Sequence, residues 1–308
     1  MTGSPLPRLD GAHPLETMRG RLKLALAAIS LALCLSWLVG AFSPRCAGSC
    51  LYLEAAFALS LALLGHRLFL PALLGSTFVS ISGLAMGVQS LPDLGMGVSL
   101  AGLGFCLAER IPSRRAVTFK ADEVPRQTIH AAFGILFCLM ILAFGTYISS
   151  GIILAGTLAG MLIMHLVQRG LRGSLIERLM GHLEREGAIP GEGSLYYALG
   201  VLFALGLLRE SPIHAISVIL ILSLGDSLAT VIGRKGRHPL PWNGEKSFEG
   251  SLGFILGCLP ALLVLPGPAT AIAIIVAWAT ESLPRIDDNI TVPMASAMAY
   301  RLILGPCG

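Results

Sequence analysis

Long apolar runs, each wide enough to cross a bilayer as a helix, recur along most of this chain. A membrane-spanning helix needs about 20 mostly apolar residues, and fewer where neighbouring helices cover its ends. The runs that meet this condition lie at 22–42, 51–65, 68–88, 94–108, 128–147, 149–167, 194–209, 211–232, 248–265, 267–282 and 289–305. They predict an all-α fold, a polytopic transmembrane bundle of about eleven helices.

The charge content supports this prediction. Charged residues make up 13% of the chain and hydrophobic residues 54%, whereas roughly 25% of the residues in soluble domains are charged. The net charge of +4 does not indicate nucleic acid as a partner, because the basic residues fall in short segments between apolar runs. We therefore expect the bilayer to be the main solvent.

The basic residues also predict the orientation. With the N-terminus inside, nineteen of the 22 lysines and arginines lie in cytoplasmic segments, as the positive-inside rule requires. A missed helix would invert every later loop, so the bias supports the helix count as well. Cys46 and Cys50 share a loop on the opposite side and would pair only if that side is oxidising. Short loops and no evident targeting segment favour a prokaryotic cell membrane, and the endoplasmic reticulum also fits the charge bias.

A charged, proline-containing segment at 109–127 divides the chain. We predict an accessory N-terminal transmembrane domain of about four helices at 1–118 and a functional core of about seven helices at 119–308. Nearly all distinctive polar residues lie in the core, which is where function is expected.

Asp226 is the most informative of these polar residues, because it lies inside the apolar run at 211–232. It precedes the helix end by about seven residues, which places it ~10 Å below that end. An ionisable group at such a depth is costly and indicates function. Thr230 and Arg234 follow at steps of four and share its helix face. A structural ion pair between Asp226 and an arginine is the alternative.

The loop after this helix is basic and rich in glycine, with Arg234, Lys235, Arg237 and Lys246 interleaved with Gly233, Gly236, Gly244 and Gly250. Ser247 is expected to be the N-cap of the next helix. A helix N-terminus beside Lys246 is a suitable site for phosphate. The loop therefore predicts a polyphosphate site, although the positive-inside rule alone would also explain its charge.

A second acidic cluster, around Asp287 and Asp288, stands at another predicted cytoplasmic helix end. Carboxylates beside a phosphate site suit Mg²⁺, which proteins hold through one or two carboxylates together with substrate phosphates. Asp226, Asp287 and Asp288 are the candidate metal ligands and acid–base groups. A solvated turn at Asp287 and Asp288 is the alternative reading. The chain contains no GxxxxGK[ST] motif and no HRD or DFG motif, so phosphoryl transfer would need another scaffold.

These motifs resemble the dolichol kinase and phytol kinase family of CTP-dependent polyprenol kinases. The resemblance is carried by four segments of the chain and covers roughly 119–308. The segments are Arg126 with His130, Gly225 to Arg234, Pro241 to Ser251, and Glu281 to Pro293.

The resemblance implies transfer of the γ-phosphoryl group of CTP, with Mg²⁺, to the hydroxyl of an isoprenoid alcohol such as dolichol, a polyprenol, phytol or geranylgeraniol. It implies that Asp226, Lys246 and Asp288 are catalytic, and that Asp287 and Asn289 help to close the site. The residues that would bind the nucleotide are Gly233, Arg234, Lys235, Arg237, Asn243, Lys246, Ser247, Glu249 and Gly250.

Two other functions were weighed. Phosphatidate cytidylyltransferase shares the Asp…Gly-Arg and Lys-Ser/Thr-x-Glu-Gly patterns, but its later lysine-rich signature is absent, and Asp287 to Asn289 with Val292 and Pro293 stands in its place. A transporter would carry its polar groups near the membrane midplane. Here they gather at one predicted surface, which favours the kinase.

Overall fold

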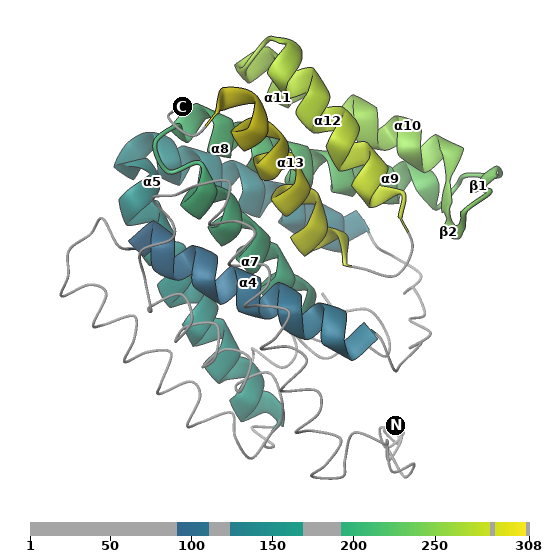
Figure 1. Ribbon diagram of the computed structural model, residues 1–308. Coiled ribbons are helices and arrows are strands. Elements are labelled where there is room, and N and C mark those ends of the chain that lie inside the picture. The colour runs from purple at the N-terminus through teal and green to yellow at the C-terminus, as the bar shows by residue number, and fades with distance from the viewer. Residues whose placement is uncertain (1–90, 111–123, 169–191, 284–286, 306–308) are drawn as a thin grey trace, which may run out of the picture.

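The computed structural model describes residues 91–110, 124–168, 192–283 and 287–305, and within them the chain is mostly helical (Figure 1). The helices are α4 (Leu91–Arg110), α5 (Val124–Gln168), α7 (Glu192–Leu207), α8 (Pro212–Leu220), the π-helix η4 (Ile221–Gly225), α9 (Asp226–Gly233), α10 (Phe248–Gly257), α11 (Leu259–Val264), α12 (Pro268–Glu281) and α13 (Asp288–Leu304). Two short strands, β1 (Pro239–Leu240) and β2 (Asn243–Ser247), complete the described elements.

The predicted runs from 94–108 onward are confirmed as helical in the described part of the chain. The expected break between 128–147 and 149–167 falls at Gly145, which interrupts α5 with φ 74° and ψ 175°. Glycine adopts this left-handed φ without steric cost. The runs at 22–42, 51–65 and 68–88, like Cys46 and Cys50, lie outside the described residues, so the count of about eleven helices stays a prediction.

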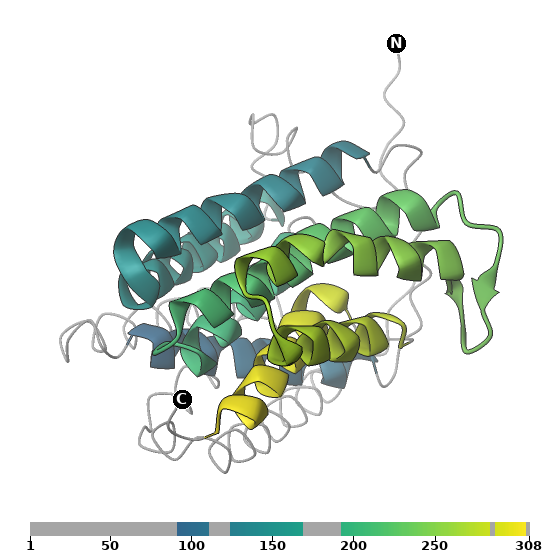
Figure 2. The same cartoon turned by 90° about the horizontal axis from the view of Figure 1, so that it is seen from above.

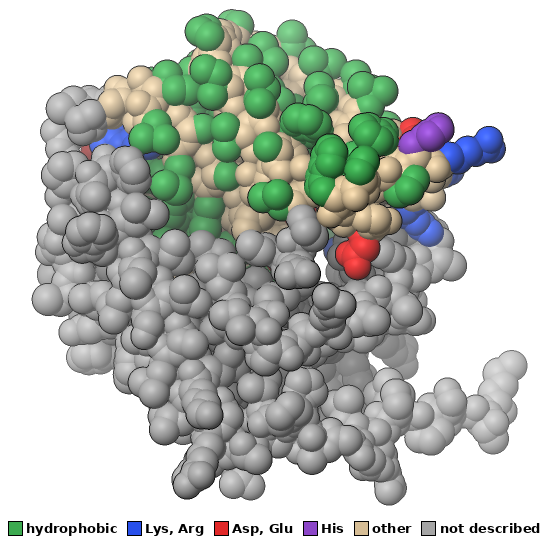
Figure 3. Space-filling view, turned by 45° about the vertical axis from the view of Figure 1, so that its right-hand side comes forward, with side chains coloured by type: hydrophobic (Ala, Val, Ile, Leu, Met, Phe, Trp, Pro, Cys, Tyr) green, Lys and Arg blue, Asp and Glu red, His purple; other side chains and the backbone are tan. Residues whose placement is uncertain are grey.

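Two of the described helical segments, Val124–Gly160 and Pro212–Gly233, are long and apolar enough to cross a membrane. The segment Val124–Gly160 exposes large apolar side chains on its outer side, with Leu136 54% and Leu142 69% exposed. In Figure 3 the described part of the face is covered largely by hydrophobic side chains, and most of its charged side chains lie towards the right-hand end. Both features are typical of a helix bundle in lipid.

Small residues let the helices approach closely. A Cβ at Gly206 of α7 would lie 2.6 Å from the Cβ of Met96 in α4, and one at Gly200 would lie 2.3 Å from the Asn289 carbonyl in α13. An ion pair between Asp93 and Arg209 also joins α4 to the segment after α7. The helix α4, which belongs to the predicted accessory region, therefore lies along α7 of the predicted core (Figures 1 and 2). Most of the predicted boundary, 109–127, lies outside the described residues.

The helical order is interrupted by a small hairpin that projects from one end of the bundle (Figure 2). Its strands pair antiparallel, Pro239 with Ser247 and Leu240 with Asn243. The predicted all-α fold lacked this hairpin. Its short polar segments do not show the alternation of apolar and polar residues that predicts strands. The hairpin carries Lys246 back towards the ends of α12 and α13.

A π-helical turn, η4, precedes Asp226 directly. Such turns insert an extra residue into a helix and are frequent at functional sites. This turn decides which way α9 and its first residue face the bundle, and composition gives no signal for it.

Gly257 offers a test of close packing. A Cβ there would lie 2.3 Å from the Leu224 carbonyl oxygen, a backbone atom that cannot yield. We expect Gly257→Ala to destabilise the protein by about 1–3 kcal/mol, more than the helix propensity gained from alanine. Gly156→Ala in α5 is the control, because its new Cβ would meet no described atom within 4 Å beyond the adjacent backbone of its own helix. Equal melting temperatures for the two variants in detergent would contradict the packing.

Candidate active site

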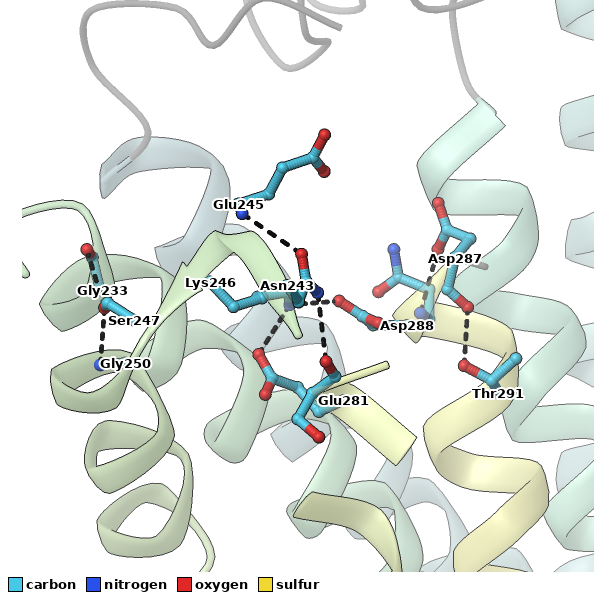
Figure 4. Close-up of polar contacts among 12 residues, drawn as sticks. Gly233, Asn243, Glu245, Lys246, Ser247, Gly250, Glu281, Asp287, Asp288 and Thr291 are labelled. Carbon is cyan, nitrogen blue, oxygen red and sulfur yellow. Dashed lines mark hydrogen bonds and ion pairs between the residues drawn. The ribbon is translucent and has the colours of Figure 1, made fainter. Parts of the chain in front are cut away.

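The strand β2 meets the ends of α12 and α13 and the start of α9 at the end of the bundle that carries the hairpin. Lys246 of β2 lies between Glu281 and Asp288 (Figure 4). Its Nζ donates to Glu281 Oε1 at 2.6 Å and to Asp288 Oδ2 at 2.6 Å. Glu281 is the last residue of α12 and Asp288 the first of α13. Asp226, buried at the start of α9, is close enough to act electrostatically on both Lys246 and Asp288.

The charges in this cluster do not balance. Burial opposes the charge on Lys246, but the carboxylates of Asp288, Glu281 and Asp226 outweigh it and hold the pKa of this amine above its usual value. Burial raises the pKa of Asp288 to about 7, with Lys246 opposing the shift and Asp226 and Glu281 adding to it. Three carboxylates therefore share one ammonium group, and the cluster carries excess negative charge.

Two buried acceptors here lack hydrogen-bond partners among the described residues: Glu281 Oε2 and Asn289 Oδ1. Buried polar atoms almost always have a partner, so such atoms indicate that a ligand or ion belongs at the site. Together with the excess negative charge, they fit a cation. In the part of the chain that the structure describes, no three His, Cys, Asp or Glu side chains form a metal site by themselves. Mg²⁺ does not require such a set, since water and phosphate oxygens commonly complete its shell.

Ser247 joins α9 to α10. Its Oγ accepts from the Gly250 N–H at 3.1 Å, which confirms the predicted N-cap, and donates to the Gly233 carbonyl at 3.2 Å (Figure 4). A Cβ at Gly250 would lie 3.0 Å from the Gly233 Cα. These three residues, which were predicted to bind the nucleotide, therefore bring α9 and α10 into close contact. The Gly250 N–H already donates to the Ser247 cap.

Glu249 and Asn243 hold the loop and the hairpin in place. The Glu249 carboxylate accepts from the Arg237 N–H at 3.0 Å and contacts His238 Nδ1 at 2.7 Å. Asn243 is buried, and its Nδ2 donates to the Ser282 carbonyl at 3.2 Å. Through these contacts the hairpin is tied to the end of α12, which places Lys246.

Comparison with known proteins identifies the relatives of this chain. It is 29% identical over 286 residues to phytol kinase 1, chloroplastic, of Arabidopsis thaliana, covering 78% of this chain and 92% of that protein. It is 32% identical over 240 residues to probable phytol kinase 1, chloroplastic, of Glycine max, covering 68% and 77%. The chain belongs to the phytol kinase family. The farnesol kinase of Arabidopsis thaliana is also related, with 31% identity over 206 residues, 59% of this chain and 66% of the kinase.

Membership of the phytol kinase family confirms the resemblance predicted from the motifs. The chain matches no protein-family profile, and no solved structure matches it. The named relatives favour the kinase over the cytidylyltransferase.

The structure separates the site residues predicted for this phytol kinase family member into two groups. Lys246 and Asp288 are in contact, with Asp226 nearby. Asp287 instead caps α13, where its Oδ1 accepts from the Asn289 N–H at 3.0 Å. The side chains on the loop after α9, namely Arg234, Lys235 and Arg237, are exposed. The roles of both groups in binding metal and nucleotide stay predictions.

Sequence reasoning did not select Glu281, which is 2% exposed and holds Lys246. The available signal was its place at the end of an apolar helix, where a buried acid needs a partner. It also gave little weight to His130, on whose ring Asp226 acts, and did not select Gln127, whose backbone carbonyl accepts from Ser227 and whose side chain is buried.

The raised pKa of Asp288 predicts how stability depends on pH. The carboxyl group of aspartate titrates near 3.9 in an unfolded chain, and in the folded protein Asp288 titrates at about 7. Its contribution to stability is therefore fully present below about pH 4 and is lost as the pH rises through about 7. We expect the melting temperature of the metal-free protein to fall between pH 5 and pH 8, and to fall less in Asp288→Asn. Equal slopes for the two proteins would contradict this pKa.

Proposed function

We propose that this protein is a membrane-embedded kinase that transfers the γ-phosphoryl group of CTP to the hydroxyl of an isoprenoid alcohol. The observation that carries the proposal is the partly buried cluster of Lys246, Glu281 and Asp288 beside Asp226. It belongs to a chain whose named relatives are kinases of phytol and farnesol. Both compounds are isoprenoid alcohols, and dolichol, other polyprenols and geranylgeraniol belong to the same substrate class.

The fold supports an acceptor with a long apolar tail. The cluster lies at one end of helices whose outer faces are apolar, so a hydroxyl can meet the polar residues while its tail stays in lipid. The positive-inside bias predicts that this end faces the cytoplasm, in a prokaryotic cell membrane or in the endoplasmic reticulum. The plant relatives are chloroplastic, and a chloroplast membrane satisfies the same requirement for lipid.

Phosphoryl transfer depends mainly on positioning and on neutralising charge. In this proposal Lys246 binds phosphate oxygens, and the exposed basic loop of Arg234, Lys235 and Arg237 attracts the triphosphate. The hydroxyl oxygen of the alcohol bonds to the γ-phosphorus. The bond between the γ-phosphorus and the oxygen that bridges it to the β-phosphate breaks, and CDP leaves with that oxygen. Asp226 accepts the hydroxyl proton.

The cluster also fits Mg²⁺ as a cofactor. Asp226 and Asp288 would hold the ion, and the unpartnered oxygen of Glu281 lies in the same cluster. When bound, Mg²⁺ supplies charge neutralisation to the phosphates of the nucleotide. Asp287, the third predicted ligand, already accepts a hydrogen bond as the N-cap of α13.

A panel of donors tests the proposal. Purified protein with Mg²⁺ and farnesol is offered CTP, ATP, GTP or UTP, each labelled at the γ-phosphate, and the lipid product is extracted. We expect CTP to give most of the labelled farnesyl phosphate. A faster reaction with ATP would overturn the choice of donor, and no labelled lipid with any nucleotide would overturn the kinase.

A further inference from the structure

Two polar residues in the first turns of α5, Gln127 and His130, lie near the start of α9. The Ser227 hydroxyl, next to Asp226 in the chain, donates to the Gln127 carbonyl at 3.1 Å and joins α9 to this part of α5. His130 lies one turn further on, where Asp226, Asp287 and Arg126 all act on its ring. Gln127 and His130 therefore belong to the same end of the bundle as Lys246, on a helix that the mechanism above does not use.

Both side chains present a buried atom without a hydrogen-bond partner among the described residues: Gln127 Oε1 and His130 Nε2. Their surroundings select the kind of ligand. An amide oxygen accepts and does not donate, and two acids, Asp226 and Asp287, outnumber Arg126 around the His130 ring, which disfavours an anion. A hydroxyl group is small and neutral, and because it both donates and accepts it suits an amide oxygen and an imidazole nitrogen.

A series of aromatic rings leads away from this point. The His130 ring lies 4.3 Å from the ring of Tyr197, edge to face. Tyr197 lies 5.9 Å from Phe137, and Phe137 lies 6.1 Å from Phe133. The Tyr197 hydroxyl is fixed by Ser223 at 2.8 Å, and Phe133 is 48% exposed on the outer apolar surface. The rings thus connect the polar cluster with the part of the surface that lipid would cover.

We propose that Gln127 and His130 bind the hydroxyl of the acceptor alcohol, and that Phe137 and Phe133 contact the isoprenoid tail as it leaves towards the bilayer. The proposal rests on the proposed kinase function. Hydrogen bonds at Gln127 and His130 orient the hydroxyl and take no part in the proton transfer. The aromatic rings offer apolar faces to the methyl-branched, unsaturated tail, so they favour acceptors with longer apolar tails.

Removing the hydroxyl contacts tests the first half. In Gln127→Leu and His130→Phe the side-chain shape is roughly kept and the polar atom is lost. We expect kcat/KM for the alcohol to fall by about tenfold or more, equally for 3-methylbut-2-enol, with one isoprene unit, and for farnesol, with three. The KM for CTP should stay within about twofold of the wild-type value, because a site for the acceptor does not bind the donor. A purely structural role would move both constants or neither.

Shortening the aromatic series tests the second half. Phe133→Ala should lower kcat/KM for farnesol by about three- to tenfold and lower that for 3-methylbut-2-enol less, because the shorter tail has less apolar surface to place against this ring. Phe144→Ala is the matched control, on the same helix and 55% exposed but outside the aromatic series. Equal effects of the two substitutions on farnesol would overturn the tail path.

The wild-type protein separates the two levels of the proposal. If it phosphorylates no isoprenoid alcohol, the proposed function fails. If it phosphorylates farnesol while Gln127→Leu and His130→Phe keep the wild-type KM and kcat for alcohols, the hydroxyl site is wrong and the function stands. Melting temperatures report on folding, and if a buried variant fails to fold, the comparison of Phe133→Ala with Phe144→Ala on the two alcohols decides.

Discussion

Asp226→Asn is expected to lower the rate of phosphoryl transfer by about a thousandfold while the protein stays folded. Asp226 is buried, begins α9 directly after the π-helical turn, and acts on Lys246 and Asp288. Asparagine keeps the size of the side chain but cannot accept the proton of the attacking hydroxyl. Because the cluster carries excess negative charge, removing one carboxylate should not lower the melting temperature. Both quantities are measured on purified protein in detergent.

Glu245→Gln is the control for this substitution. Glu245 is exposed on the same hairpin as Lys246, and its side chain points away from the cluster in Figure 4. The change in charge is the same, so full activity in Glu245→Gln shows that charge alone is not responsible. An Asp226→Asn protein with half or more of the wild-type rate would remove Asp226 from the mechanism.

Lys246→Met is expected to have the largest effect on stability. It leaves Glu281, 2% exposed, and Asp288 without their shared cation. Removing one partner of a buried ion pair typically costs about 3–5 kcal/mol, and because the Lys246 side chain is 27% exposed we expect a loss near the lower end, about 3 kcal/mol. Any remaining activity should show a raised KM for the nucleotide, because Lys246 is the amine proposed to bind its phosphates.

A second substitution isolates the electrostatic cause. Lys246→Met combined with Glu281→Gln removes one of the stranded charges, so this double variant should regain part of the lost stability without regaining activity. Lys235→Met, on the exposed loop, is the matched control and should melt like the wild type. If Lys246→Met melts at the same temperature as Lys235→Met, the contacts of Lys246 do not stabilise the fold.

Apolar runs predicted the described helices well, because burial in lipid and helix length are both properties of composition along the chain. The Ser247 cap was predictable for a similar reason, since its geometry is local. The contact of Lys246 with Glu281 was not, because it depends on a hairpin and on a helix end 35 residues further along. The π-helical turn before Asp226 and the unpartnered atoms of Gln127 and His130 are likewise products of packing.

The motifs predicted the family, but they did not separate the residues proposed for chemistry from those whose contacts are structural. Ser247, Glu249 and Asp287 belong to the same motifs as Lys246 and Asp288, yet their visible contacts hold helices and loops together. A motif gives residue types and their spacing. The contacts of each side chain appear only in the folded chain.

The most direct test of the proposed reaction follows the phosphorus atoms of CTP. Purified protein is incubated with Mg²⁺ and CTP labelled at either the α- or the γ-phosphate, with geranylgeraniol, a dolichol and phosphatidic acid offered in parallel. We predict that label from the γ-position appears in an isoprenoid alcohol and that α-label enters no lipid. Incorporation of α-label into the product of phosphatidic acid, with no phosphorylated alcohol, would contradict the kinase and establish a cytidylyltransferase.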